Sequence, residues 1–485
     1  MQNIESKGIK AFFWDFSGKT IRQIIGFITS IILTRTLEPT DFGIMALVMV
    51  IIGITSIFSD FGLSSALIQK RKILQIHYSS VFYFNLATGF ILTFITFLSA
   101  DWIGFFYENE KLAPVIRTIS PSFVLNAFGS VSIIKLRKEL SFALLTKYSL
   151  LTTLMSGFLG IILALNNAGI WSLAAQALSM SLIYNIIIWK VAKWRPIWSF
   201  SWKALAQLWS FGFRMFLSAI LSSILERVDI LAIGKLVTST TLGYFERAKS
   251  LNTILIQYSS GSLIDTLFPT LSTIQNNLPR LQKVIIKTIG ITSFISFLIT
   301  GNLYLTSDEI IIILFSEKWS SSSEFFKLFI LTGYSYPINA VLVSTLSCRG
   351  NSKSFLRLEV YKAMITSINI IALYISGVKA YLYCMIVSTF PMLLLNILFA
   401  TKEIEISYIR IAKPIIVQML ISTISLAISI FSSNIFSEQF PHFFALESLI
   451  FTVFYMLANN LIKTDGYIYS KELILLTLKI HANEK

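Results

Sequence analysis

The chain has 485 residues, of which 55% are hydrophobic and only 13% are charged, and its 40 phenylalanines are too many for one water-facing core. This composition excludes a soluble globular protein and predicts a polytopic, all-α membrane protein. The net charge of +15 would suggest nucleic acid in a soluble protein, but the Lys and Arg residues here lie in short loops between apolar segments. We therefore expect no nucleic-acid partner.

The first predicted helix follows Ser17-Gly18-Lys19-Thr20, which looks like the end of a nucleotide-binding phosphate loop. Such a loop also needs a glycine five residues earlier, and Phe13 occupies that position. A mostly apolar run then continues from Lys19 to Arg35. The stretch predicts a membrane helix that begins near Lys19, preceded by an interfacial amphipathic segment and without a removable signal peptide.

The chain contains about fourteen apolar stretches of roughly twenty residues, the length that crosses the hydrocarbon core of a bilayer. These predicted spans lie near residues 18–36, 42–60, 80–100, 115–134, 145–165, 170–189, 217–236, 249–269, 284–304, 325–345, 358–376, 379–399, 411–431 and 442–462.

The loops between these spans alternate in charge. Alternate loops are basic and include Lys70, Arg71, Lys72, Lys135, Arg137, Lys138, Lys190, Lys193, Arg195, Arg280, Lys283, Arg349, Lys353, Lys402 and Arg410. The opposite loops are acidic or nearly uncharged and include Asp101, Glu108, Glu110, Asp308, Glu309, Glu317 and Glu438. The positive-inside rule then places both termini in the cytoplasm.

The chain repeats itself at an offset of 200 residues. "TRTLEPTDFG" at 34–43 aligns with "GKLVTSTTLG" at 234–243, which matches Arg35 to Lys235 and Gly43 to Gly243. The offset equals six spans, so the two halves would have the same orientation about an axis along the membrane normal. We predict two pseudo-symmetric six-helix bundles, residues 1–203 and 204–400, followed by two helices and a cytoplasmic tail in residues 401–485.

The sequence resembles the polysaccharide-transporter family of the multidrug, oligosaccharidyl-lipid and polysaccharide exporter superfamily, close to its colanic-acid-type flippases. The resemblance rests on "TRTLEPTDFGIMALVMVIIGITSIFSDFGLSSALIQKR" (34–71) and "DILAIGKLVTSTTLGYFERAKSL" (229–251). It continues in "KLRKELSF" (135–142), "GIWSLAAQ" (169–176) and "LFPTLSTIQ" (267–275). Where the family usually has Leu-Gly, this chain has Leu37-Glu38 and Val237-Thr238.

The resemblance implies V-shaped, MATE-like helical lobes that open alternately to each side of a bacterial inner membrane. It also implies a cargo, an undecaprenyl-pyrophosphate-linked oligosaccharide destined for O-antigen, capsule or exopolysaccharide. Membrane lipids, a coupling proton or sodium ion, a polysaccharide polymerase and glycosyltransferases are the other partners that it implies. The alternatives are an ion-coupled drug or small-molecule antiporter of the same superfamily and a membrane glycan polymerase.

A polar face on the first helix is the first candidate site. Lys19, Arg22 and Gln23 fall within about 60° of Gly26 on a helical projection, together with Thr29 and Ser30. These cations are suited to a pyrophosphate, and Lys135, Arg137 and Lys138 offer a possible landing site for it. Interfacial snorkelling of Lys19 and an orienting role for the basic loop are the alternatives.

A set of carboxylates around the seventh helix is the second candidate site. Glu226 and Asp229 share a face three residues apart, near the middle of the span, where charges are costly unless they face a cavity or a cation. We predict that they bind the coupling ion, and Asp60 and Asp265 on neighbouring helices are further candidates for it. Arg227 is a candidate for cargo binding and would pair near Asp60 or Asp265. A salt-bridge network that only fastens helices together is the alternative. Arg35 and Lys235 would either guide the emerging pyrophosphate or stabilise outer loops.

The residues that carry enzymatic or metal chemistry are scattered. His77, His442 and His481 form no metal-binding motif, and Cys348 and Cys384 are not placed to form a disulfide. We therefore predict no catalytic residue, no metal site and no cofactor.

Overall fold

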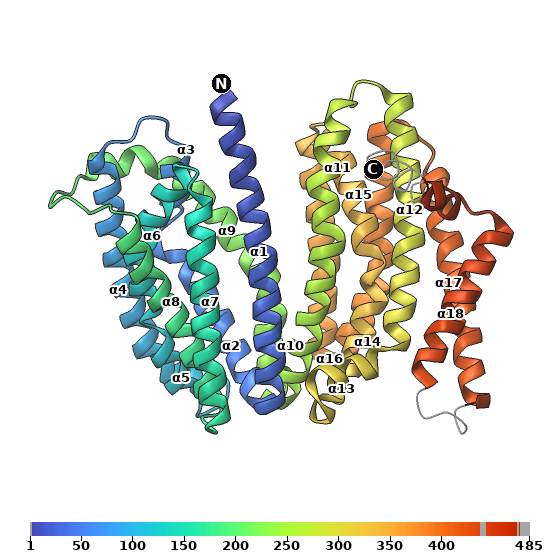
Figure 1. Cartoon of the computed structure of the whole chain (residues 1–485), viewed down its shortest axis with the longest axis horizontal. Helices are drawn as coiled ribbons and strands as arrows, with labels where there is room; N and C mark the ends of the chain where they lie inside the picture. The colour runs from blue at the N-terminus through green and yellow to red at the C-terminus, as the bar shows by residue number, and fades with distance from the viewer. Residues whose placement is uncertain (1, 437–442, 473–474, 476–485) are drawn as a thin grey trace, which may run out of the picture. The chain divides into compact units, whose positions relative to one another are not determined.

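The computed structural model describes residues 2–436, 443–472 and 475, and every regular element in these residues is a helix (Figure 1). Within this part of the chain, eleven helices are long and apolar enough to cross a membrane. The predicted class, an all-α polytopic membrane protein, is confirmed. The count of fourteen spans is consistent with these helices and stays a prediction.

The longest helix, α16 (Ser352–Ile404), contains two helices that meet at Gly377. Gly377 has φ 81° and ψ −173°, a backbone conformation that is essentially restricted to glycine. The stretch Lys353–Ile404 is 52 residues long, more than twice what one crossing of about 20 residues requires. Gly377 falls in the gap between the predicted spans 358–376 and 379–399, so α16 can supply both.

The backbone at Gly377 gives a direct prediction for stability. Gly377→Ala is expected to lower the free energy of unfolding by about 1–3 kcal/mol, because alanine is strained in this conformation. The matched control is Gly261→Ala: Gly261 also has open space where a Cβ would lie, but its φ is −61°. Thermal unfolding of the purified protein in detergent compares the two variants. Equal midpoints would contradict the strain argument.

The helices pack into two compact units, Met1–Glu246 and Arg247–Lys485. The N-terminal unit contains nine complete helices among its described residues: α1 (Gln2–Thr36), α2 (Pro39–Ser56), α3 (Leu63–Gln69), α4 (Gln75–Phe106), α5 (Leu112–Ile119), α6 (Ser122–Lys138), α7 (Phe142–Leu165), α8 (Ile170–Val191) and α9 (Trp202–Leu236). It also includes the first turns of α10 (Ser239–Ile256). The predicted boundary between the halves, after residue 203, rests on the sequence repeat and stays a prediction.

The bounds of the first two helices recur 200 residues later, in α9 and α10, as the sequence repeat predicts. The aligned residues also touch one another in the N-terminal unit. The hydroxyls of Thr40 and Thr240 lie 2.9 Å apart, and a Cβ on Gly43 or Gly243 would collide with the backbone of the other helix. Small residues allow this close helix crossing, as is common inside membranes.

A second recurrence lies deeper in the helices. Asn185 of α8 donates to the side-chain oxygen of Asn126 in α6 over 2.9 Å. In the other unit, Asn396 of α16 donates to Asn339 of α15 (Ser335–Cys348) over 2.8 Å. The donors lie in the sixth and twelfth predicted spans and the acceptors in the fourth and tenth, so the pairing is consistent with duplicated halves.

The C-terminal unit continues with α11 (Ser262–Thr273), α12 (Leu278–Leu305), α13 (Ser307–Phe315), α14 (Ser321–Gly333), α15, α16, α17 (Tyr408–Phe436) and α18 (Phe443–Ile462). Its core joins α12 to α15, α16, α17 and α18 through buried aliphatic and aromatic side chains. The last two helices are also fastened by polar groups: Tyr455 donates to the carbonyl of Phe294, and Gln418 donates to Asn459. Hydrogen bonds of this kind hold helices in register where water is absent.

Candidate functional site

The polar face predicted on α1 divides into an exposed part and a packed part. Lys19 is exposed and forms an ion pair with Asp15, with 2.6 Å between Nζ and the carboxylate. Thr29 is buried against Gly157 of α7, the helix on which α1 chiefly packs. Arg22 and Gln23 are half-buried between these two parts. Arg22 forms no ion pair among the described residues, so its charge is available to a ligand.

Arg22 belongs to a cationic cluster formed by three helices. The guanidinium groups of Arg22 and Arg137, the latter in the last turn of α6, both interact electrostatically with the hydroxyl of Tyr184 in α8. Arg137 is exposed and Tyr184 is half-buried. Two guanidinium groups within electrostatic range of one hydroxyl provide positive charge of the kind that binds a phosphate group. We call Arg22, Arg137 and Tyr184 the cationic cluster.

The sequence identified two members of this cluster and missed the third. Arg22 was predicted from the polar face of the first helix, and Arg137 from the basic loop after the fourth span. Tyr184 lies in a largely apolar helix, and only the packing of α8 against α6 and α7 brings it to the arginines. No local sequence signal distinguishes it from a tyrosine of the helix core.

The acidic residues predicted around the seventh helix lie in different surroundings. Glu226 is exposed on α9, and Asp229, one turn further on, is half-buried and accepts a hydrogen bond from the backbone N–H of Ile230. Arg227 is half-buried, and its guanidinium packs 3.1 Å from where a Cβ on Gly53 of α2 would lie. The absence of a side chain on Gly53 therefore makes room for this cation.

Of the other two predicted acidic residues, the structure describes only the side chain of Asp60. The carboxylate of Asp60 accepts hydrogen bonds from the backbone N–H groups of Gly62 and Ser64, at 2.8 and 3.3 Å. It thereby caps the start of α3, and no described ion pair joins it to Arg227. Asp265 belongs to α11, and its side chain lies outside the described residues. The roles predicted for Glu226, Arg227, Asp229, Asp60 and Asp265 stay predictions.

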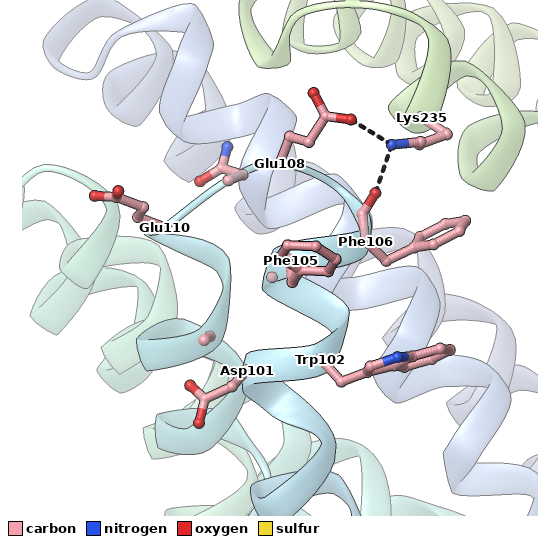
Figure 2. Close-up of a pocket in the computed structure, with 10 residues that line it drawn as sticks. Asp101, Trp102, Phe105, Phe106, Glu108, Glu110 and Lys235 are labelled. Carbon is pink, nitrogen blue, oxygen red and sulfur yellow. Dashed lines mark hydrogen bonds and ion pairs between the residues drawn. The ribbon is translucent and has the colours of Figure 1, made fainter.

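A pocket of about 900 Å³ lies where α4 ends, beside the last turn of α9 (Figure 2). Lys235 of α9 donates to the carboxylate of Glu108 and to the carbonyl of Phe106, both over 2.7 Å. Its ammonium also lies 5.2 Å from the centre of the Phe106 ring. The hydrogen bond from Lys235 holds the pKa of Glu108 below its usual value, so Glu108 stays charged at neutral pH. Lys235 thus stabilises the α4–α5 turn. Stabilising an outer loop is one of the two roles predicted for it from the sequence.

A second pocket, of about 550 Å³, lies within the C-terminal unit. It is lined by α10, α11, α12, α14 and α15 and by the π-helical turn Gln257–Gly261. Most of the lining side chains are isoleucine and leucine, and none of those described is charged. Asn252, Thr292 and Ser296 are its buried polar groups among the described residues. Its lining favours an apolar chain and not a phosphate.

Among the described residues, His77, Cys348 and Cys384 line neither pocket and lie outside the cationic cluster. His77 is buried, and its ring nitrogen Nε2 lies 3.0 Å from the side-chain oxygen of Gln207. Cys348 and Cys384 are free. His442 and His481 lie outside the described residues.

The fold defines a class of multi-pass membrane protein. A solved structure titled as the lipid II flippase MurJ in an inward closed conformation has a TM-score of 0.72 to this chain and is 17% identical to it. The match covers 96% of this chain and all of that one, so the two share one fold.

The chain belongs to the polysaccharide biosynthesis protein family, whose sequence model matches residues 32–324. The lipopolysaccharide biosynthesis protein WzxC of Escherichia coli is 23% identical over 75% of this chain and 74% of its own. The succinoglycan biosynthesis transport protein ExoT of Rhizobium meliloti is 24% identical over 63% of this chain and 62% of its own. These findings confirm the family resemblance inferred from the sequence.

Proposed function

We propose that this chain is a flippase that moves an undecaprenyl-pyrophosphate-linked oligosaccharide across the bacterial inner membrane for surface polysaccharide synthesis. Its family and its fold support this proposal, because the relatives above are named for lipopolysaccharide and succinoglycan synthesis and the solved structure for lipid II flipping. The single observation that carries it is the cationic cluster, in which the guanidinium groups of Arg22 and Arg137 both interact electrostatically with Tyr184.

The cationic cluster matches the part of the cargo that a membrane resists most. A pyrophosphate brings about two negative charges, and charge inside a bilayer is costly unless protein groups or water compensate it. Arg22 and Arg137 would hold the phosphate oxygens, and the hydroxyl of Tyr184 would donate to one of them. Lys19 and Gln23, on the same helix face, would contact the first sugar or the approaching headgroup. The undecaprenyl tail stays in lipid.

The basic end of the N-terminal unit faces the cytoplasm in this proposal, and both termini lie there. The basic loops of that unit, which contain Lys70, Lys138 and Lys190, lie at the end of its helices opposite the α4–α5 turn. The positive-inside rule assigns that end to the cytoplasm. The cargo would therefore meet the cationic cluster from the cytoplasmic leaflet, where it is made.

Transport then requires the two predicted halves, 1–203 and 204–400, to rock about the cargo and expose it alternately to each side. Glu226 and Asp229 would bind a proton or a sodium ion whose release accompanies the return stroke. The helices of residues 401–485 would add lipid-facing surface. A polymerase and glycosyltransferases would be the neighbouring enzymes in the pathway, and this chain would catalyse no covalent step.

Deleting the gene separates this function from its two alternatives. Loss of a flippase should trap short lipid-linked repeats in the cytoplasmic leaflet and remove surface polysaccharide. Loss of a polymerase would instead leave single repeats outside, and loss of a drug antiporter would change only drug tolerance. Mass spectrometry of extracted lipid-linked repeats, combined with periplasmic enzymatic labelling, tells the three outcomes apart. Single repeats outside the membrane would contradict the flippase assignment.

A further inference from the structure

The pocket beside the α4–α5 turn lies far from the cationic cluster. It has no part in the pyrophosphate binding proposed above. It includes Ala113, at the start of the 27-residue stretch Leu112–Lys138, whereas Arg137 lies at the end of that stretch. A helical stretch of this length extends roughly 40 Å, so the two sites occupy opposite ends of the N-terminal unit. The volume of about 900 Å³ is within the range of small-ligand sites.

We propose that this pocket is a sugar-binding site that receives the glycan part of the cargo on the outer side of the membrane. The inference rests on the proposed function in two respects: the cargo as the source of the sugar, and the assignment of this pocket to the outer side of the membrane. The chemistry of the pocket itself is independent of that function.

One side of the pocket provides aromatic faces. Trp102 and Phe106 lie one helical turn apart, with ring centres 6.2 Å apart and planes 24° from parallel. Trp102 is 70% exposed and Phe105 is 84% exposed, so their faces are open to a ligand. An exposed aromatic ring face packs well against the apolar C–H face of a pyranose.

The other side provides hydrogen-bond acceptors. In Figure 2 the rings of Trp102 and Phe106 lie on one side of Phe105, and the carboxylates of Asp101 and Glu110 lie on the other. Asp101 already forms an ion pair with Arg117, and Glu110 has no partner among the described residues. The Glu110 carboxylate can therefore accept hydrogen bonds from sugar hydroxyls without losing an existing contact.

A belt of aromatic residues at the membrane surface is the competing explanation for these rings. Such a belt explains why Trp102 is exposed. It does not explain the three carboxylates that line the same pocket, because carboxylates that face lipid are unfavourable. The pocket carries three carboxylates and one ammonium group, so it should select neutral or amino sugars over uronic acids.

Saturation-transfer NMR on the full-length protein in phosphatidylcholine nanodiscs tests the site directly. The probes are tri-N-acetylchitotriose, which is neutral, and trigalacturonate, which is anionic. We expect saturation transfer to the neutral trisaccharide and at least about fivefold less to the anionic one. Trp102→Ala should reduce the neutral signal by about fivefold or more, and Glu110→Gln should reduce it by a smaller factor.

Trp171→Ala is the matched control, because Trp171 is also an exposed tryptophan and lies in the first turn of α8, at the same end of the unit. It should leave the signal unchanged. Absence of a signal from the neutral trisaccharide, or equal losses in Trp102→Ala and Trp171→Ala, would overturn the sugar site. If Trp102→Ala fails to fold, Glu110→Gln still decides, because an unchanged signal in that variant contradicts the site.

The saturation-transfer experiment and the deletion of the gene test the sugar site and the proposed function separately. Trapped lipid-linked repeats in the deletion strain, together with no sugar signal, would overturn the sugar site and keep the flippase assignment. A sugar signal that depends on Trp102, together with normal surface polysaccharide in the deletion strain, would keep the sugar site and overturn the flippase assignment.

Discussion

Replacing Arg22 with glutamine is expected to reduce surface polysaccharide at least about tenfold while the protein still inserts in the membrane, because a phosphate contact from a charged group contributes about 1.5–3 kcal/mol. Arg22 is half-buried, forms no described ion pair and shares Tyr184 with Arg137. Its loss should therefore weaken cargo binding without unfolding the helix. Immunoblots of membrane fractions and polysaccharide gels measure the two quantities.

Three further variants make this result specific. Arg22→Lys should retain part of the activity, because it keeps the charge but loses the planar two-pronged geometry. Tyr184→Phe should cause a smaller loss than Arg22→Gln. Arg71→Gln removes an exposed charge from a basic loop of the same unit, outside the cationic cluster, and should change little. Normal polysaccharide in Arg22→Gln, or an equal loss in Arg71→Gln, would contradict the role of the cluster.

The double variant Glu226→Gln, Asp229→Asn is expected to abolish export as well, but for a different reason. Glu226 is exposed on a membrane helix, where a carboxylate is stable only if water or a cation reaches it. Amides keep the shape and remove the charge, so binding of a proton or sodium ion is lost. Export by the wild type should depend on external pH or sodium, and any residual export by the variant should not.

Asp60→Asn tests whether a third predicted carboxylate takes part in ion coupling or serves only as a helix cap. The Asp60 carboxylate caps α3 through the N–H groups of Gly62 and Ser64, and asparagine caps almost as well. Export by Asp60→Asn should therefore stay near the wild-type level and keep its dependence on pH or sodium. Full export by the double variant would show that Glu226 and Asp229 serve only to hold helices together.

The class of fold could be predicted from the sequence because its signals are local. A bilayer requires apolar runs of fixed length, and a repeat of 200 residues places helix ends at matching positions, as the bounds of α1 and α9 show. The break at residue 377 was also visible, as a short gap between two apolar runs. In each case the deciding residues are neighbours in the chain.

The contacts of the candidate sites depend on helices that are distant in the sequence. Tyr184 joins Arg22 only through the packing of α8, and the room for Arg227 comes from Gly53 on another helix. The pairing of Lys235 with Glu108 likewise joins two helix ends 127 residues apart. The cap formed by Asp60 differs, because Asp60-Phe61-Gly62 is a local turn signal that sequence reasoning could have used.

Reconstitution tests the central claim most directly. Purified protein is placed in liposomes with a fluorescent undecaprenyl-pyrophosphate oligosaccharide, and a membrane-impermeant quencher reports the share of cargo in the outer leaflet. We predict that the quencher reaches nearly all of the cargo in liposomes with wild-type protein, and only the outer-leaflet share with Arg22→Gln. Equal quenching in wild-type and protein-free liposomes would contradict the assignment of this chain as a lipid-linked oligosaccharide flippase.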